Sequence, residues 1–385
     1  MPPFDPNTGG VQMSTFKMSN YFVSVGHRVT VFSFEKDGHI KDSEAELFHA
    51  EFDDRHFNGV NLQYLTHVIG QIKPDIVINQ MPYEHSITEV LVKQQSINSY
   101  LLIGCLRNTL FSVKLNLDEY CESVFPKIVH PILKNAFGKF LLLQIHKRRH
   151  RADLKIILDS YDKFVMFGPP NKEEIGYFIG DYKREKLEFI PNSIPDTLSE
   201  MPKKDKVILS LGRLSIEQKR ADLLLPLWER LQSQLPDWHF WIVGGGPQYE
   251  NIERNIIERN ISRVKLWGKQ DPWEFYTKAS VFIMTSAFEG FPNTLIEAQS
   301  RGAVPVVMNS YPMVEWIVKD KEDGFLITPF DLDAMADRIL QLAKSEAELK
   351  HVGELSLSNA QRFVISEVGK AWEKLFDKHL SRNKE

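Results

Sequence analysis

The 385-residue sequence has the composition of a globular protein, with 43% hydrophobic and 25% charged residues, and its length suggests two or three domains. No apolar run reaches the ~18 residues that span a bilayer, and the first ten residues lack the basic and apolar regions of a signal peptide, so we expect neither a secreted nor a membrane-spanning protein. The net charge is −4, and the only cysteines, Cys105 and Cys121, predict a cytoplasmic protein without a disulfide framework or a zinc site.

The chain opens with a glycine-rich turn, Pro6–Gln12 (PNTGGVQ), which precedes a helical pattern to about Val25 and a strand at Val29–Phe34. In a doubly wound α/β domain such a turn follows a buried first strand. Here only MPPFD precedes it, and prolines cannot donate hydrogen bonds within a central strand. We therefore expect the first strand to be missing, through a misassigned start site or a truncation.

Five further strands are predicted in the first half of the chain, and helical patterns separate them. This alternation favours a parallel sheet that is covered on both faces. The strands are expected at Asn61–Leu65, Asp75–Asn79, Tyr100–Cys105, Lys163–Phe167 and Leu187–Ile190.

Arg107 and Asn108 follow the strand that ends at Cys105, on the carboxyl edge where such sheets bind ligands. The guanidinium of Arg107 could hold a phosphate or an acidic acceptor group. A structural role at the surface explains Arg107 equally well.

The segment 126–155 carries eight Lys and Arg residues and one acid, a net charge of +7, which leaves −11 for the rest of the chain. It also contains apolar side chains, among them Phe137, Phe140 and Ile145. Such a segment suits a helix on an anionic membrane, here the inner face of the plasma membrane, where each cation contributes about 1 kcal/mol. A core helix with a solvated basic end is an equal alternative. No nucleic acid is expected, because no recognised binding module accompanies the charge.

A polar, proline-containing stretch at 194–206 is expected to link two domains, because the strand pattern restarts directly after it at Val207–Leu211. This divides the chain into a first domain of residues 1–193 and a second domain of residues 207–364.

Two cations follow the restarted strand: Arg213, directly after Gly212, and Lys219, six residues further on. Cations at a strand end can neutralise a bound diphosphate, although most surface Lys and Arg residues are simply solvated. Two more strands, each followed by glycine, are predicted at Trp238–Val243 before Gly244–Gly246 and at Arg263–Trp267 before Gly268.

The stretch Ala279–Met308 is predicted to form a strand, a loop, a helix over Asn293–Arg301 and a second strand. Pro292 suits the first helical position and Gly302 the position after the last. Backbone N–H groups at the start of this helix lack helical partners, so they attract a phosphate-like anion.

Two carboxylates flank that helix start, Glu289 in the loop and Glu297 within the helix, with Gly290 between them. They would repel a bound anion unless each accepts a hydrogen bond from a hydroxyl of the ligand. A diphosphate with a hydroxyl-bearing ring at each end, as in a nucleotide sugar, meets this requirement. For an arbitrary pair of glutamates, a turn cap and an exposed helix residue would be the simpler interpretation.

The sequence around these glutamates resembles the signature of the retaining glycosyltransferases of family 4, which have the GT-B fold. The matching residues are SAFEGFP at Ser286–Pro292, LIEA at Leu295–Ala298, Gly302 and PVV at Pro305–Val307. The resemblance covers most of the chain. It implies an α/β protein with two Rossmann-like doubly wound domains that face each other across a cleft, and a last helix, about 365–385, that packs back on the first domain.

By this resemblance Glu289, Arg213 and Lys219 are the expected catalytic residues: Glu289 orients the sugar hydroxyls, and the two cations stabilise the leaving diphosphate. Glu297 is expected to bind the ribose. Arg107 departs from the His that many family members have at about this place. No Asp-x-Asp motif lies in the expected loop, so we expect neither a metal nor another cofactor. The other residues implied in donor binding are Gly9, Gly10, Gly212, Gly290, Phe291, Asn293, Thr294 and Leu295, with Arg107 and Asn108 on the acceptor or sugar side.

The implied reaction moves a hexosyl group from a UDP- or GDP-sugar to an acceptor hydroxyl with retention at the anomeric carbon. The basic apolar segment favours a lipid-linked or cell-surface glycan as the acceptor. One alternative is a GT-B-fold epimerase, which would turn over a nucleotide sugar without an acceptor; a phosphorylase would need a pyridoxal-binding Lys, which we do not identify. A non-catalytic, nucleotide-binding protein at the membrane surface is a further alternative.

Overall fold

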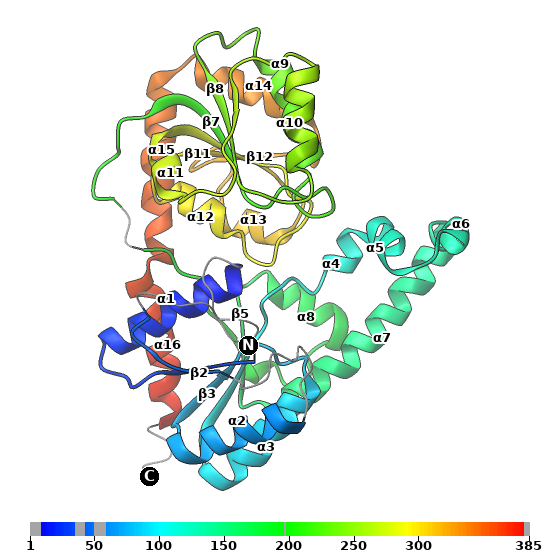
Figure 1. Cartoon of the computed structure of the whole chain (residues 1–385), viewed down its shortest axis with the longest axis vertical. Helices are drawn as coiled ribbons and strands as arrows, with labels where there is room; N and C mark the ends of the chain where they lie inside the picture. Colours follow the sequence, from blue (N-terminus) through cyan, green and yellow to red (C-terminus); the bar gives the residue numbers. More distant parts are fainter. Residues whose placement is uncertain (1–8, 35–42, 50–58, 196–197, 381–385) are drawn as a thin grey trace. The chain divides into compact units, whose positions relative to one another are not determined.

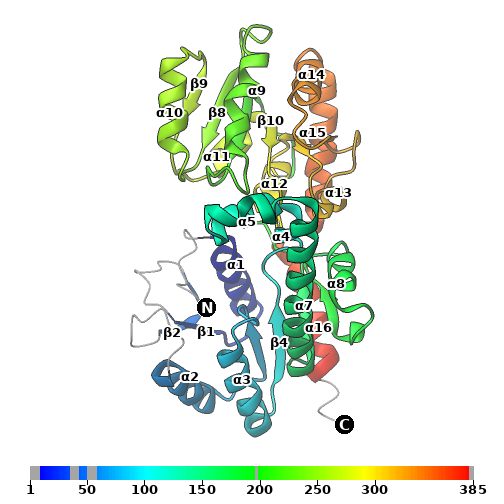
Figure 2. The same ribbon diagram turned by 90° about the vertical axis from the view of Figure 1, so that its right-hand side faces the viewer.

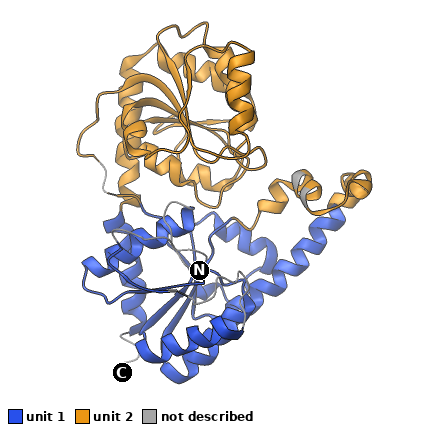
Figure 3. Cartoon of the chain, in the orientation of Figure 1, with its two compact units in different colours: residues 1–108, 140–193, 365–385 blue, residues 109–139, 194–364 orange. Residues whose placement is uncertain are grey.

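The structure is a computed structural model that describes residues 9–34, 43–49, 59–195 and 198–380. The chain divides into two compact units, which Figure 3 colours separately. Each unit combines parallel strands with covering helices, which confirms the predicted α/β class. Unit 1 comprises residues 1–108, 140–193 and 365–385, and unit 2 comprises residues 109–139 and 194–364.

Unit 2 is built on a six-stranded parallel sheet in the order β12-β11-β10-β7-β8-β9. Figure 1 labels β7, β8, β11 and β12 of this sheet. The central strand β10 is buried along its whole length, as expected for a strand covered on both faces. The strands are β7 Asp205–Leu211, β8 His239–Val243, β9 Val264–Leu266, β10 Ala279–Met284, β11 Val304–Met308 and β12 Phe325–Ile327.

One face of this sheet packs on α9, α14 and α15, where Trp228 and Ile339 join Phe240 and Val306 in one apolar core. Helices α11 and α12 contact each other and β10. The helices of the C-terminal half are α9 Leu224–Leu231, α10 Tyr249–Glu258, α11 Trp273–Lys278, α12 Asn293–Gln299, α13 Pro312–Ile317, α14 Leu332–Ala343 and α15 Glu346–Ala360, with short 3-10 turns η3 Ala221–Leu223 and η4 Gln361–Phe363.

Unit 1 has two separate parallel sheets in its described residues, β1-β2 and β3-β4-β5-β6. Strand β4 is fully buried, whereas three of the four residues of β3 are only half-buried. The strands are β1 Thr30–Ser33, β2 Glu46–His49, β3 Ile76–Asn79, β4 Leu101–Cys105, β5 Lys163–Met166 and β6 Leu187–Phe189.

The last helix of the chain, α16 (red in Figure 2), packs on the first, α1 (blue). The rings of Phe22 and Phe376 lie 5.3 Å apart, and Tyr21 Oη donates to Glu373 Oε2 at 3.2 Å. Trp372, the largest apolar side chain of α16, is buried in the same cluster. Residues 365–380 therefore complete the core of unit 1. The helices are α1 Gly10–Ser24, α2 Gly59–Ile72, α3 His85–Asn98, α7 Ala136–Ser160, α8 Asn171–Ile179 and α16 Ile365–Leu380, with η2 Arg184–Lys186.

Two features of unit 1 differ from the sequence prediction. The strand predicted at Asn61–Leu65 is wrong: these residues lie within α2, because Leu65, Val68 and Ile69 recur at helical spacing and are buried together. Strand β2 was not predicted. Part of the predicted opening turn, residues 6–8, lies outside the described residues.

The segment 109–139, which we assigned to the first domain, clusters with unit 2. Its elements are short: α4 Ser112–Leu115, α5 Leu117–Val124, η1 Lys127–Val129 and α6 His130–Leu133.

The predicted linker also belongs to unit 2. Lys204 Nζ donates to three backbone carbonyls, those of Tyr276 (3.0 Å), Thr277 (2.9 Å) and Arg301 (2.6 Å). The end of this segment is therefore anchored to unit 2 and is not a free tether.

Candidate active site

The candidate site lies where the order of the unit 2 sheet reverses. Strands β7 and β10 are neighbours, but the chain continues from β7 to β8 on one side and from β10 to β11 on the other. Since parallel crossovers are right-handed, the helices that follow these two strands lie on opposite faces. The two loops therefore diverge at the carboxyl ends of β7 and β10 and leave the crevice in which open α/β sheets bind ligands.

Glu289 is the centre of a hydrogen-bonded cluster in this crevice. Lys219 Nζ lies 2.5 Å from Glu289 Oε1, and Ser286 Oγ donates to the same oxygen at 2.8 Å. Gln218 Nε2 donates to Oε2 at 2.9 Å. Glu289 is only 6% exposed, so its charge is compensated by an ion pair and two further hydrogen bonds rather than by water.

The backbone fixes the loop that carries Lys219. Ala287 N–H donates to Gln218 O at 2.8 Å, and Thr285 Oγ1 donates to Lys219 O at 2.9 Å. The loop after β10 thus binds the loop after β7 through the main chain as well as through Glu289. A side chain held in this way is positioned before any ligand arrives, which is the condition for efficient electrostatic catalysis.

The glycines predicted at three strand ends lie side by side. Gly212 N–H donates to Val243 O at 3.0 Å, and Gly244 N–H donates to Gly268 O at 2.7 Å. Gly244 has a φ of +134°, and a Cβ at this position would lie 1.9 Å from Gly212 O. Only glycine allows this close approach of two backbones at the carboxyl edge.

Arg213 follows Gly212 and is exposed. A Cβ on Gly212 would lie 3.9 Å from Lys219 Nζ, so the two predicted cations are carried by one loop beside the crevice. The Lys219–Glu289 pair carries no net charge, and the exposed guanidinium of Arg213 is therefore the main source of positive charge on this loop.

Glu297 lies on α12 and accepts a hydrogen bond from Tyr276 Oη at 3.1 Å. Tyr276 lies on α11 and is fully buried, and burial, together with the charge of Glu297, raises its pKa well above the ordinary value. The hydroxyl therefore stays protonated and orients the carboxylate. Sequence reasoning missed Tyr276, because no local pattern links it to Glu297.

The helix start differs in detail from the prediction. Helix α12 begins at Asn293 and has seven residues, with Pro292 in the capping position, so its dipole is smaller than that of a full-length helix. Asn293 and Thr294 are half-buried, and Gly290 is buried. Gly302, with a φ of +72°, follows the helix end, and a Cβ there would lie 2.3 Å from Met201 Sδ.

Two of the predicted donor-binding residues have buried side chains. Phe291 packs its ring against Phe363 at 5.7 Å and Trp316 at 6.5 Å, and Leu295 is 0% exposed. Their side chains pack in the core of unit 2, so only their backbone groups could contact a ligand. The apolar character of both residues is a signal of burial that the sequence prediction did not use.

The other predicted residues belong to unit 1. Gly9 precedes α1 in an extended conformation, with a φ of 174° that any residue can adopt, and Gly10 is the first residue of the helix. Their conformation alone does not require glycine. A need for close ligand approach at Gly9 and Gly10 stays a prediction.

Arg107 lies at the carboxyl edge of β4, as predicted, and takes part in a polar cluster. Its Nε donates to Gln80 Oε1, and its Nη1 donates to Asn192 Oδ1 at 3.3 Å, an oxygen that also accepts from Ser14 Oγ at 2.9 Å. Gln80 and Asn192 follow β3 and β6, and sequence analysis did not find them. Asn108 is exposed.

Helix α7 bears the predicted mixture of apolar and basic residues. Leu154, Ile157 and Leu158 near its end are buried, whereas four apolar residues near its start are exposed. The exposed fractions are 73% for Phe137, 59% for Phe140, 47% for Leu141 and 55% for Ile145. The spacing i, i+3, i+4, i+8 places these four side chains on one face of the helix.

No helix in the described part of the chain is both long and apolar enough to cross a bilayer.

Part of unit 2 matches a known protein family. Residues 198–356 match the family described as glycosyl transferases group 1. The chain is 30% identical over 201 residues to an exopolysaccharide phosphotransferase of Streptomyces coelicolor, a match that covers 51% of this chain and 21% of the relative. It is 30% identical over 170 residues to a lipopolysaccharide 1,6-galactosyltransferase of Salmonella typhimurium, covering 42% of this chain and 46% of the relative.

The fold is that of solved GT-B glycosyltransferases. The crystal structure of HepE from Anabaena in complex with UDP and glucose matches 98% of both chains with a TM-score of 0.70 at 15% identity. The predicted GT-B architecture is therefore confirmed. The match covers about a fifth of the length of the exopolysaccharide phosphotransferase and about half of the length of the galactosyltransferase.

Proposed function

We propose that this protein is a retaining hexosyltransferase, because residues 198–356 match the family described as glycosyl transferases group 1 and the chain has a GT-B fold. It transfers a hexosyl group from a UDP- or GDP-sugar to an acceptor hydroxyl. The observation that carries the proposal is the cluster of Lys219, Glu289, Gln218 and Ser286 at the switch point between β7 and β10.

The chemistry follows from the charges around this crevice. Negative charge grows on the diphosphate as the glycosidic bond breaks, and preorganised cations lower the energy of that state. Arg213 and Lys219 are the proposed cations. Because the charge comes from these side chains, the proposed reaction needs no metal ion.

Glu289 is proposed to hold the sugar. An ionised carboxylate has about four acceptor sites, and Glu289 accepts three hydrogen bonds from its neighbours. A sugar hydroxyl can occupy the remaining site. Glu297, oriented by Tyr276, is proposed to accept from the ribose hydroxyls.

The acceptor is proposed to be a lipid-linked or cell-surface glycan, and the protein to work on the anionic inner face of the plasma membrane. The exposed apolar face of α7 supports this, since it is followed along the helix by Lys147, Arg148, Arg149 and Arg151. A relative named lipopolysaccharide 1,6-galactosyltransferase is consistent with such an acceptor. Aromatic and apolar side chains beside cations are typical of interfacial helices.

The direct test is incubation of the full chain with UDP- and GDP-hexoses, an acceptor lipid extract and EDTA, with detection of released nucleotide. Nucleotide release that depends on the acceptor and persists in EDTA is expected, and the Lys219→Met variant should lower its rate by about 100-fold or more. Conversion of the nucleotide sugar into an isomer in a reaction without acceptor would indicate an epimerase. Inverted anomeric configuration in the product, read by NMR, would contradict the retaining mechanism.

A further inference from the structure

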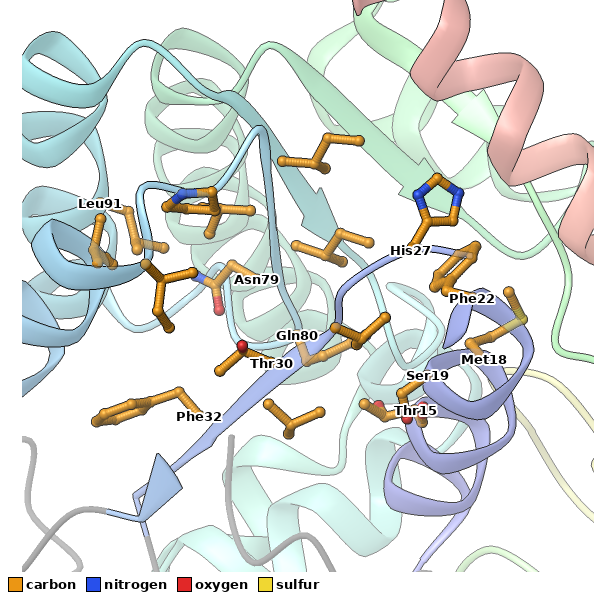
Figure 4. A pocket seen from close by; sticks show the side chains of 18 of the residues that line it. Thr15, Met18, Ser19, Phe22, His27, Thr30, Phe32, Asn79, Gln80 and Leu91 are labelled. Carbon is orange, nitrogen blue, oxygen red and sulfur yellow. Dashed lines mark hydrogen bonds between the residues drawn. The ribbon is translucent and has the colours of Figure 1, made fainter. Parts of the chain in front are cut away.

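The polar cluster around Arg107 lies at the carboxyl edge of the β3-β4-β5-β6 sheet of unit 1. Gln80 directly follows β3, and Arg107 and Asn192 come shortly after β4 and β6. Figure 4 shows Asn79, the last residue of β3, and Gln80 beside a cavity that Arg107 also lines. Open α/β sheets bind ligands outside the carboxyl ends of their strands. The cluster therefore lies where a ligand of unit 1 is expected.

The partners of the Arg107 guanidinium among the described residues are uncharged. Its Nε donates to Gln80 Oε1, and its Nη1 donates to Asn192 Oδ1 at 3.3 Å. Its Cζ lies 5.9 Å from the centre of the Phe167 ring. Burial raises the pKa of the adjacent Cys105 thiol, so this thiol adds no negative charge. No Asp or Glu in the described part of the chain forms an ion pair with Arg107.

Other partly buried cations of unit 1 face negative groups. Lys163 Nζ lies 2.8 Å from Glu188 Oε1. Lys186 Nζ donates at 2.7 Å to two backbone carbonyls at the C-terminal end of α7, where the helix dipole is negative. Arg107 is also half-buried. Because a charge removed from water is costly unless an opposite charge faces it, Arg107 is suited to an anion that a ligand supplies.

The guanidinium of Arg107 keeps hydrogen-bond donors for such an anion. Of the five N–H groups of an arginine side chain, Gln80 and Asn192 use one each, and both N–H groups of Nη2 have no acceptor among the described residues. A guanidinium binds a carboxylate or phosphate through two parallel hydrogen bonds. Asn192 is 6% exposed and also accepts from Ser14 Oγ at 2.9 Å, so Arg107 is held in place before a ligand binds.

We propose that Arg107 binds an oxyanion of the acceptor, a carboxylate or a phosphate, and thereby selects anionic acceptor sugars over neutral ones. Gln80 and Asn192 are positioning residues, because they hold the guanidinium. The assignment to the acceptor rests on the proposed glycosyl transfer, in which the side chains for the nucleotide sugar, such as Lys219 and Glu289, belong to unit 2. Unit 1 then provides the site for the acceptor.

The test measures binding to the full chain in the absence of a donor sugar. Three probes share a glucose-type ring: methyl glucuronide carries a carboxylate, glucose 6-phosphate carries a phosphate, and methyl glucoside is neutral. Titration calorimetry gives the affinities. The Nε–Hε NMR resonance of Arg107, which is identified by its absence from the Arg107→Gln variant, shows whether a probe lies at this guanidinium. Arg184→Gln is the matched control, because Arg184 belongs to unit 1 but pairs with Asp181 at 2.6 Å.

We expect one or both anionic probes to shift the Arg107 resonance and to bind at least about tenfold more tightly than methyl glucoside, because hydrogen bonds between charged groups are the stronger ones. Binding of only one anionic probe identifies the anion as a carboxylate or as a phosphate. The Arg107→Gln variant should lose the preference for anions, and Arg184→Gln should keep it. The Arg107→Lys variant, which keeps the charge but not the two parallel hydrogen bonds, should retain a weaker preference and replaces Arg107→Gln if that variant fails to fold.

Equal affinities for the three probes, or no saturable binding of either anion, would overturn the proposal. An anion preference that persists in Arg107→Gln, or that is undiminished in Arg107→Lys, would overturn the assignment to Arg107. The result is separable from the proposed function, because no turnover is measured. Anion binding at Arg107 in a protein that transfers no sugar would confirm the anion site and overturn only its assignment to an acceptor.

Discussion

At the scale of single residues, the site depends on how Glu289 and Lys219 compensate each other. Each is removed from water to a large extent, with side-chain exposures of 7% and 23%. Removal of one partner leaves the other charge poorly compensated, which costs more than the pair itself contributes. Substitutions that keep the side-chain volume therefore test function better than truncations.

Lys219→Met keeps most of the volume of Lys219 and removes its charge. We expect turnover to fall by about 100-fold or more, because loss of one preorganised donor to a developing anion costs roughly 2.7–4 kcal/mol. Arg213→Ala should have an effect of the same size. The measurement is the rate of nucleotide release from the donor sugar.

Lys206→Met is the matched control, because Lys206 is an exposed lysine of the same unit. It should retain full activity. Near-normal activity of Lys219→Met would refute the assignment of Lys219 to the diphosphate.

Glu297→Ala is expected to weaken nucleotide binding more than it lowers turnover, since the carboxylate is proposed to contact the ribose. Tyr276→Phe should give a smaller change in the same direction, because it removes only the hydroxyl that orients Glu297. Titration calorimetry with UDP and GDP measures both effects. Unchanged affinity in Glu297→Ala would show that the ribose role is wrong.

At the scale of helices and strands, one lysine connects three elements of unit 2. Lys204, just before β7, donates to carbonyls at the end of α11 and to Arg301 O beyond α12, so it braces the two helices that carry Tyr276 and Glu297. Burial lowers the pKa of Lys204 from 10.5 to about 7. The folded chain therefore binds fewer protons than the unfolded chain between about pH 7 and pH 10.

The free energy of unfolding should consequently rise with pH from about 7 towards 10, since stability increases wherever the unfolded state binds more protons. The Lys204→Met variant should lack this rise in unfolding free energy with pH. The Lys203→Met variant should keep it, because Lys203 is a neighbouring exposed lysine. Urea denaturation followed by tryptophan fluorescence at pH 7, 8 and 9 measures the difference. Parallel pH profiles for the wild type and Lys204→Met would contradict the prediction.

Helix α7 offers a second test at this scale. Replacing Phe137, Phe140 and Leu141 together by Ser should abolish sedimentation with liposomes that contain anionic lipid, because the apolar anchor is lost. The basic residues should make binding of the wild type weaker at high salt. Ile257→Ser is the control, since Ile257 is 74% exposed on α10 and lacks such a basic neighbourhood along its helix. A wild type that stays in the supernatant would argue against the membrane surface as a partner.

At the scale of the whole molecule, the chain leaves unit 1 after residue 193 and returns at residue 365. Unit 1 therefore folds completely only when α16 packs on α1. The contact is apolar and includes the buried Trp372, so it stabilises unit 1 mainly by removing apolar surface from water.

Trp372→Ala should lower the stability of unit 1 by about 3–5 kcal/mol, the usual cost of such a truncation in a core. Unit 2 should keep its stability and its affinity for nucleotide. Hydrogen exchange, measured separately for the peptides of each unit, shows which unit is destabilised. Lys370→Ala, at an exposed position on the same helix, is the control. Equal loss of protection in both units would contradict independent cores.

The sequence alone determined the class of the fold, and it predicted much of the candidate site. Central parallel strands such as β4 and β10 are buried on both faces, so they read as continuous apolar runs. Glycines at strand ends follow from local backbone geometry, as Gly244 shows. The motif around Glu289 and Glu297 is likewise local, so it can be identified without knowing how the chain packs.

Only the tertiary structure decided which residues meet. Gln218 and Lys219 reach Glu289 across about seventy positions of the chain, and Tyr276 reaches Glu297 from another helix. Local periodicity carries no information about such contacts, and it also misassigned residues 61–65, because a short apolar run fits a strand as well as a buried helix.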